Sequence, residues 1–97
     1  MDVIFHRRIQ HDLRAALFYY DTEGGSVLGD RFFAAAEAAT LKVIANPRGH
    51  HFVSPTLRRI SLDTFPYHFI YEENPRMISF MVLRHDKRHP SFGLRRK

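Results

Sequence analysis

The stretch LRRISLDTFPYHFIYEENPRMISFMVL, residues 57–83, decides the fold. Its side chains alternate between two faces with a period of two, so that Arg58 and Ile60 share one face while Arg59 and Ser61 share the other. This alternation is typical of β-strands. It predicts three consecutive strands, which cover residues 57–62, 65–72 and 77–83.

Two short polar segments join these strands. Asp63-Thr64 allows a tight connection, and the composition of Glu73-Asn74-Pro75-Arg76 is typical of a hairpin turn. Consecutive strands that are joined by tight turns pair with one another in opposite directions. We therefore expect a three-stranded antiparallel meander.

The apolar residues upstream of Gly49 recur with helical spacing instead. One stripe comprises Ile9, Leu13, Leu17 and Tyr20, and a second comprises Leu28, Phe32, Ala36, Ala39 and Val43. Gly24-Gly25 between the stripes is a suitable helix end, because glycine accepts left-handed backbone geometry. Asn46-Pro47 ends the second helix, because a residue before proline avoids helical geometry. The pattern predicts an antiparallel hairpin of two helices.

A helical hairpin followed by a meander predicts an α+β fold, with the hairpin packed on one face of a small antiparallel sheet. The apolar run Val3-Ile4-Phe5 predicts a short first strand, which makes the sheet four-stranded if it pairs with the meander. No internal repeat, low-complexity tract or Gly/Ser-rich linker interrupts the sequence, so we expect one domain over residues 1–97. The sheet face away from the helices would then be open.

The composition excludes several classes of protein. None of the 97 residues is cysteine, which excludes a disulfide scaffold, a thiolate zinc site and a cysteine nucleophile. Hydrophobic residues make up 44% and charged residues 26%, which is ordinary for a globular domain and argues against intrinsic disorder. No apolar run is long enough to span a membrane, and residues 1–8 lack the apolar core of a signal peptide. We expect a soluble protein of the cytoplasm.

Positive charge is concentrated near the C-terminal end of the sequence. Fifteen Lys and Arg against ten Asp and Glu give a net charge of +5, and residues 84–97 alone contain six cations and one acid. A segment that carries the whole net charge favours a polyanionic partner, either a nucleic acid or an acidic protein. Arginine predominates among the cations, and its guanidinium group binds phosphate or carboxylate bidentately. The alternative is a solvated terminus that only aids solubility.

The seven histidines do not form a metal-binding pattern. His50 and His51 are adjacent, so their side chains would point to opposite sides of an extended chain. His85 and His89 would share a helix face, but Pro90 disfavours a helix there. The sequence contains no glycine-rich phosphate loop and no nucleophile elbow. We expect no metal site, no cofactor and no standard hydrolase.

Two basic clusters flank the meander. Arg58-Arg59 enters its first strand and residues 84–90 leave its third, and we expect the two clusters to converge in space. There His85 would act as a general acid or base, and Arg59 and Arg88 would stabilise the phosphoryl transition state. RNA cleavage through the RNA's own 2′-hydroxyl needs little more than these groups and no metal. The alternative is that Arg59 and His85 only cap strand ends or hold an acidic partner.

Five short motifs follow one another along the chain. They are Asp12-Leu13 with Tyr19-Tyr20, then Gly29-Asp30-Arg31-Phe32, then Asn46-Pro47, then Arg59 with Phe65-Pro66-Tyr67 and Tyr71, and finally His85 with Arg88 and Pro90. In this order and at these spacings they resemble the RelE/ParE superfamily of toxins from bacterial type II toxin–antitoxin systems. The resemblance runs nearly from end to end.

This resemblance implies a microbial-RNase-like fold and a growth-inhibiting toxin that a cognate antitoxin neutralises. RelE-like members cleave mRNA in the ribosomal A site, whereas ParE-like members inhibit DNA gyrase. Arg59 falls where ribonuclease members place a strand arginine, His85 near where some place a catalytic histidine, and Arg88 at a further basic position. The C-terminal tyrosine of several ribonuclease members is absent, and Phe92 has no hydroxyl to replace it. The W-G and L-H-Q-like signatures of typical ParE members are also missing.

We predict ribosome-dependent mRNA cleavage by a metal-independent endoribonuclease. The alternatives are inhibition of DNA gyrase and a non-toxic module that binds nucleic acid or antitoxin. The residues expected to bind the nucleic acid are Arg58, Arg84, Lys87, Arg95 and Arg96. An acidic antitoxin segment would fold onto an apolar groove on the outer face of the helical hairpin, with Arg14 and Arg31 on the rim.

Overall fold

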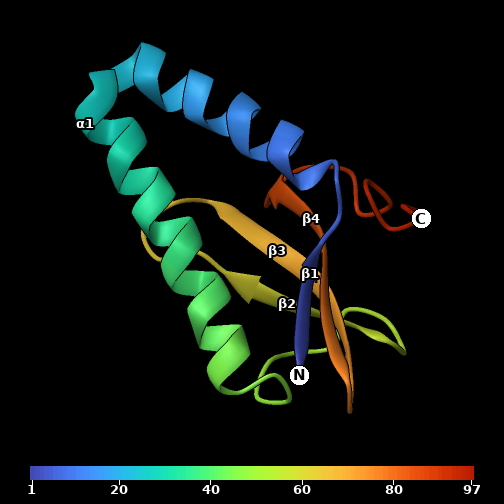
Figure 1. Ribbon diagram of the computed structural model, residues 1–97. Coiled ribbons are helices and arrows are strands. Elements are labelled where there is room, and N and C mark those ends of the chain that lie inside the picture. Colours follow the sequence, from blue (N-terminus) through green and yellow to red (C-terminus); the bar gives the residue numbers. More distant parts are fainter.

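The computed structural model describes residues 1–97 (Figure 1). Its elements are β1 (Asp2–Phe5), α1 (Ile9–Ala45), β2 (Leu57–Ser61), β3 (Tyr67–Asn74) and β4 (Met77–His85). α1 packs on one face of a four-stranded sheet, which confirms the predicted α+β class. The bounds of the predicted strands differ from those in the structure by at most two residues. α1 does not combine the length and the apolar character that spanning a membrane requires.

The strands of the sheet are ordered β1-β4-β3-β2. β2, β3 and β4 form the predicted antiparallel meander, and β1 adds the fourth strand beside β4. β1 runs parallel to β4, so the sheet is mixed rather than wholly antiparallel as we expected. The reason is that α1 returns the chain to the end of the sheet at which β1 begins, so β2 and β4 both run in the direction of β1 (Figure 1).

α1 consists of two helical arms, a first arm (residues 9–24) and a second arm (residues 26–45). Gly25 between them has a φ of 76° and a ψ of −178°, a backbone conformation that favours glycine. The predicted helical hairpin is therefore confirmed, with its bend at the predicted Gly24-Gly25 pair. The arms diverge from this bend and only partly cover the sheet (Figure 1).

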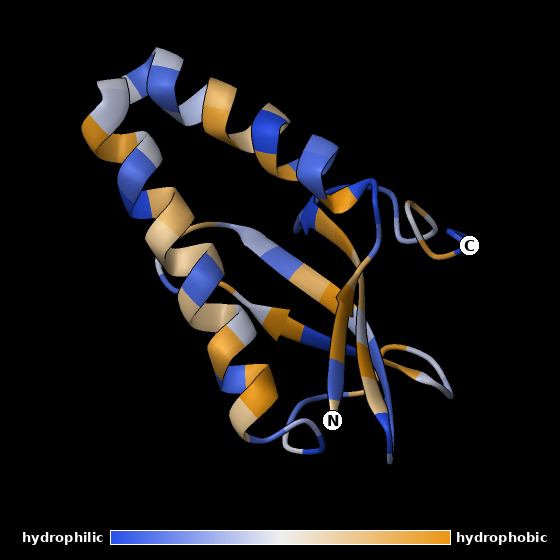
Figure 2. Cartoon of the chain, in the orientation of Figure 1, coloured by the Kyte–Doolittle hydropathy of each residue, from blue (hydrophilic) through white to orange (hydrophobic).

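The main core lies between α1 and the sheet. Its largest fully buried side chains are Phe32 on the second arm, Tyr71 on β3 and Phe80 on β4. The ring of Phe32 stacks on that of Tyr20, with centroids 5.0 Å apart, and this contact joins the second arm to the first. Both arms alternate hydrophobic with hydrophilic residues, whereas β1 is hydrophobic over most of its length (Figure 2).

The C-terminal segment, residues 86–97, lies on the sheet face away from α1, which we call the second face. Phe92 and Leu94 of this segment pack against the buried side chains of Leu57, Ile70 and Val82. Gly93 between them has a φ of 81°, and a Cβ at this position would lie 2.6 Å from the side chain of Val82. The second face, which we expected to be open, is therefore partly covered by the chain's own basic segment.

Candidate functional site

A row of four polar side chains crosses the second face. Arg59 on β2, His68 on β3 and Arg84 on β4 each lie two residues from a buried apolar side chain of that face, so alternation places them there too. Nε of Arg84 donates to Nε2 of His68 at 2.9 Å. Oδ1 of Asp86 lies 2.7 Å from Nδ1 of His68 and accepts a hydrogen bond from Nη2 of Arg59 at 3.3 Å. The row is continuous from Arg84 to Arg59.

These contacts determine the protonation of His68. Because Nε2 accepts a hydrogen bond from Arg84, the hydrogen of the neutral ring sits on Nδ1, which donates it to Asp86. Burial lowers the pKa of His68 from its ordinary value of 6.5, although the hydrogen bond to Asp86 partly opposes this shift. The side chain is only 1% exposed. His68 therefore supports the strands and does not present a proton to a substrate.

Arg84 is a structural residue of the second face. Its Nη1 donates to the carbonyl oxygens of Pro90 and Phe92 at 2.7 and 2.9 Å, which holds the C-terminal segment in place. Burial lowers the pKa of Arg84, and the nearby charge of Arg59 adds to this effect. We expected Arg84 to contact an RNA backbone. Its guanidinium is instead buried and committed to three hydrogen bonds within the chain.

A pocket of about 250 Å³ lies beside the end of β4, between the first arm and the C-terminal segment. His11, Tyr67, His85 and Arg88 are among its lining residues. The backbone N–H of Lys87 donates to Nδ1 of His85 at 3.0 Å, so the hydrogen of the neutral ring sits on Nε2. His85 can then donate a hydrogen bond from Nε2 to an anion, while its Nδ1 is engaged by the backbone.

The structure brings together only two of the three predicted catalytic residues. His85 and Arg88 line the same pocket, whereas Arg59 belongs to the second face. The separation follows from strand alternation, because His85 pairs with Tyr67 on the helix-covered face. The expected convergence of the two basic clusters is seen only in part: Arg59 forms an ion pair with Asp86 at 3.3 Å, whereas Arg58 contacts the loop between α1 and β2. β2 and β4 run in the same direction, so the start of β2 and the end of β4 lie at opposite ends of the sheet, and only the long side chain of Arg59 reaches Asp86.

Arg58 lies away from both sites. Its Nη1 donates to the carbonyl oxygens of Arg48 and His50 at 3.1 and 2.8 Å, and its Nη2 lies 3.6 Å from a carboxylate oxygen of Glu73. The guanidinium carbon also stands 3.8 Å above the centre of the Phe52 ring. These contacts fix the loop between α1 and β2. Arg58, which we expected to bind a nucleic acid, thus makes its contacts within the protein.

Arg96 is likewise committed to an internal ion pair. Its Nη1 and Nη2 donate to the two carboxylate oxygens of Asp12 at 2.6 and 2.8 Å, and both side chains are less than 10% exposed. Asp12 also accepts a hydrogen bond from the backbone N–H of Leu83 at 3.1 Å. The other predicted binding residues are exposed and make no ion pair; they are Arg14, Arg31, Lys87 and Arg95.

An apolar groove of about 200 Å³ opens where the two arms diverge. Phe5 of β1, Leu13 of the first arm and Phe33 of the second arm line it, and Phe69 and Leu83 of the sheet line it as well. Phe5 and Phe33 are 48% and 47% exposed, which is unusual for residues of this size. The groove can therefore receive an apolar face of a partner.

Comparison with solved structures identifies the fold. The chain is similar to one of a structure described as the "Chromosomal ParDE TA system from P. aeruginosa", with a TM-score of 0.75 and 17% sequence identity. The similarity covers 88% of this chain and 95% of that chain. This chain shares the fold of that ParDE chain. No model of a protein family matches the sequence, and no curated protein matches it.

Within this fold, sequence reasoning missed His68 and the acidic partners of the arginines. His68 stands one residue from the Phe-Pro-Tyr motif and shares a strand face with Ile70, so period-two alternation could have assigned it to the second face. Asp86 and Asp12 carried no comparable pattern, because their partners lie 27 and 84 residues away in the sequence. No group of three or more metal-ligating side chains is placed to hold an ion.

Proposed function

We propose that this chain is the toxin component of a type II toxin–antitoxin system, which inhibits growth until a cognate antitoxin binds it. The observation that carries the proposal is the similarity of fold to a chain of a ParDE system over 88% of the present chain. The ordered motifs from Asp12-Leu13 to Pro90 support it independently, because they belong to the amino-acid sequence and not to the fold.

The apolar groove supports an antitoxin as the partner. An amphipathic helix binds such a groove by inserting apolar side chains at successive turns. Phe5 and Phe33 supply large exposed rings, and the exposed cations Arg14 and Arg31 lie on the two arms that flank the groove. A net charge of +5 favours an acidic segment, because opposite charges accelerate encounter. The antitoxin segment would fold as it binds.

Inducible expression in bacteria tests the toxin role. Growth should stop when the chain is produced alone and resume when the antitoxin encoded beside it is also produced. Phe33→Glu places a charge in the groove, so this variant should remain toxic but escape neutralisation. Phe18→Glu is the matched control, because Phe18 is 74% exposed on the first arm and does not line the groove. Normal growth with soluble chain present would overturn the proposal.

For the effector step, the geometry favours inhibition by binding over the mRNA cleavage that we predicted from the sequence. Three observations support this choice. Arg59 lies across the sheet from His85, Nδ1 of His85 is occupied by a backbone N–H, and His68 is buried. Binding needs no catalytic base, and DNA gyrase is the target that the family resemblance offers for this mode of action.

Ribosome-dependent mRNA cleavage is the second candidate, because His11, His85 and Arg88 line one pocket and metal-free cleavage needs acid–base and cationic groups together. The two candidates separate in one paired assay with the purified chain. We expect DNA gyrase activity to fall while translated mRNA stays intact, and His85→Ala to change growth inhibition by less than about threefold. Cleavage of mRNA that falls about 10²–10⁴-fold in His85→Ala would instead establish the ribonuclease.

A further inference from the structure

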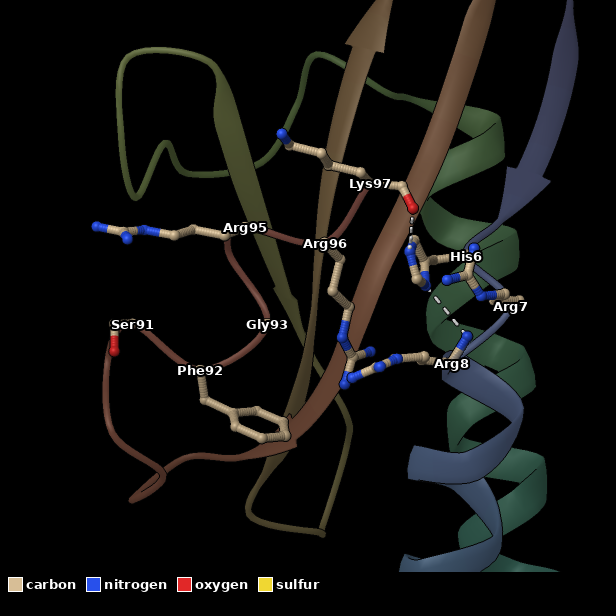
Figure 3. Close-up of a pocket in the computed structure, with 9 residues that line it drawn as sticks. All are labelled: His6, Arg7, Arg8, Ser91, Phe92, Gly93, Arg95, Arg96 and Lys97. Atoms are coloured by element: carbon tan, nitrogen blue, oxygen red, sulfur yellow. Dashed lines mark hydrogen bonds between the residues drawn. The ribbon is translucent and has the colours of Figure 1, made fainter.

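A cationic cleft of about 670 Å³ separates the β1–α1 connection from the C-terminal segment (Figure 3). Residues 6–8 form one wall and residues 91–97 form the other, so the cleft joins two regions that are far apart in the sequence. Its lining contains four arginines and one lysine, but no aspartate or glutamate; the five cations are Arg7, Arg8, Arg95, Arg96 and Lys97.

Hydrogen bonds join the two walls. The backbone N–H of Arg8 donates to Nδ1 of His6 at 3.1 Å, so the ring donates through Nε2 to the main-chain oxygen of Lys97 at 2.9 Å (Figure 3). The Arg96 guanidinium is anchored by Asp12 and by the carbonyl oxygen of Met81 at 3.1 Å. The cleft is therefore built before any ligand arrives.

Most of the positive charge in the cleft is not neutralised. Arg7, Arg8, Arg95 and Lys97 are exposed and make no ion pair, while Asp12 balances only Arg96. The guanidinium groups of Arg8 and Arg96 extend toward the same point (Figure 3). Like charges that gather in this way repel one another, and a bound anion would relieve the repulsion.

We propose that this cleft binds the phosphodiester backbone of a nucleic acid, whether or not the chain is a toxin. Guanidinium groups suit phosphate oxygens, and interfaces with nucleic acids are more polar and more positive than those with proteins. An acidic protein segment fits less well, because the only hydrophobic residue in the lining is Phe92. The guanidinium carbons of Arg88 and Arg96 stand 3.9 and 5.4 Å from the centre of that ring.

We expect the cleft to contact the backbone of a nucleic acid rather than its bases. Phe92 is the only hydrophobic residue in the lining, and two guanidinium groups already stand against its ring. Affinity should then depend strongly on salt. Four contacts to a single strand give a slope of log K against log salt of about −3, at roughly −0.7 per phosphate. Binding should weaken roughly fiftyfold between about 50 and 200 mM salt.

Fluorescence anisotropy with labelled oligonucleotides of mixed sequence tests the proposal on the purified chain. The probes are single-stranded RNA, single-stranded DNA and duplex DNA. Binding of any of these probes supports the site, and the probe that binds most tightly identifies the kind of nucleic acid that the cleft prefers. Arg8→Glu and Arg95→Glu should each weaken binding at least tenfold and make the salt slope shallower by about one. Arg8→Lys, which keeps the charge, should stay within about threefold of the unsubstituted chain.

Arg76→Glu is the matched control, because Arg76 is exposed in the β3–β4 turn, makes no ion pair and lies outside the cleft. It should weaken binding by less than about threefold. The proposal is wrong if Arg76→Glu weakens binding as much as Arg8→Glu does. It is also wrong if the chain binds polyglutamate but none of the oligonucleotides at equal salt. Circular dichroism of each variant confirms that the fold is kept.

Discussion

Replacing Asp12 by alanine should destabilise the protein more than any exposed substitution of similar size, because Asp12 holds the C-terminal segment against the first arm. The change removes both carboxylate oxygens that accept from Arg96, at 2.6 and 2.8 Å. It also leaves the Leu83 N–H without its acceptor. The side chains of Arg96 and Asp12 are 9% and 5% exposed, so water replaces these partners poorly.

Two independent arguments give the same size for this effect. A hydrogen bond to a charged group contributes about 1.5–3 kcal/mol, so two of them contribute about 3–6 kcal/mol. Removal of one partner from a buried ion pair costs about 3–5 kcal/mol, because the remaining charge is left without compensation. We therefore expect the free energy of unfolding to fall by about 4 kcal/mol, out of roughly 5–15 kcal/mol for a domain of this kind. The melting temperature should fall by roughly 16–32 °C.

Urea and thermal unfolding, followed by circular dichroism, measure this loss. Asp30→Ala is the control, because Asp30 is exposed on the second arm and makes no ion pair, so its effect should stay within about 0.5 kcal/mol. Adding Arg96→Met to Asp12→Ala should recover part of the stability, since no guanidinium is then left buried alone. A loss below about 1 kcal/mol in Asp12→Ala, or a double variant whose loss equals the sum of the two single losses, would refute the reasoning.

Three further predictions concern the second face and the core. Burial lowers the pKa of His68 below 6.5, so the unfolded chain takes up a proton first as the pH falls. Below about pH 6.5 this group should therefore reduce the free energy of unfolding by at most about 1.4 kcal/mol per pH unit. If His68→Gln leaves this dependence of stability on pH unchanged, the prediction is wrong. Gly93→Ala should lower the melting temperature more than Gly25→Ala does. Both glycines have a positive φ, but only a Cβ at position 93 would meet the side chain of Val82. Equal decreases in melting temperature would show that this clash does not exist. Tyr71→Phe removes a 2.6 Å hydrogen bond and should reduce the free energy of unfolding by about 0.5–1.5 kcal/mol, and no loss in a urea titration would count against that bond.

The local elements could be predicted from the sequence because their patterns are local. The apolar stripe of Phe32, Ala36 and Val43 and the Gly24-Gly25 pair each depend on a few neighbouring residues, and both were confirmed. The meander was predicted for the same reason, since turns such as residues 73–76 leave strand neighbours few ways to pair. The direction of β1 relative to β4 could not be predicted, because nothing in four residues specifies a partner more than 70 residues away.

The candidate site was only partly predictable, for a geometric reason. Arg59 and His85 have the residue types that the chemistry needs, but their chemistry depends on which sheet face each side chain occupies. Alternation along a strand fixes that face once one neighbour is known to be buried, as Ile70 is for His68. The long-range ion pair of Arg96 with Asp12 leaves no periodic pattern at all. Sequence reasoning therefore found the basic residues, but it predicted that several arginines bind a ligand although they have structural roles.

The pairing of β1 with β4 has a consequence for the timing of synthesis. β1 is made before α1, β2 and β3, yet its partner on the sheet, Met77–Phe80, follows all three. At about 5–20 residues per second, the strand waits roughly 4–16 s with its apolar side chains unpaired. α1 can form in that interval because its contacts are local. A chain interrupted before residue 77 would thus carry both helical arms but no partner strand for β1. A partner that recognises the groove beside Phe5 would meet the complete groove only on chains that extend past Leu83.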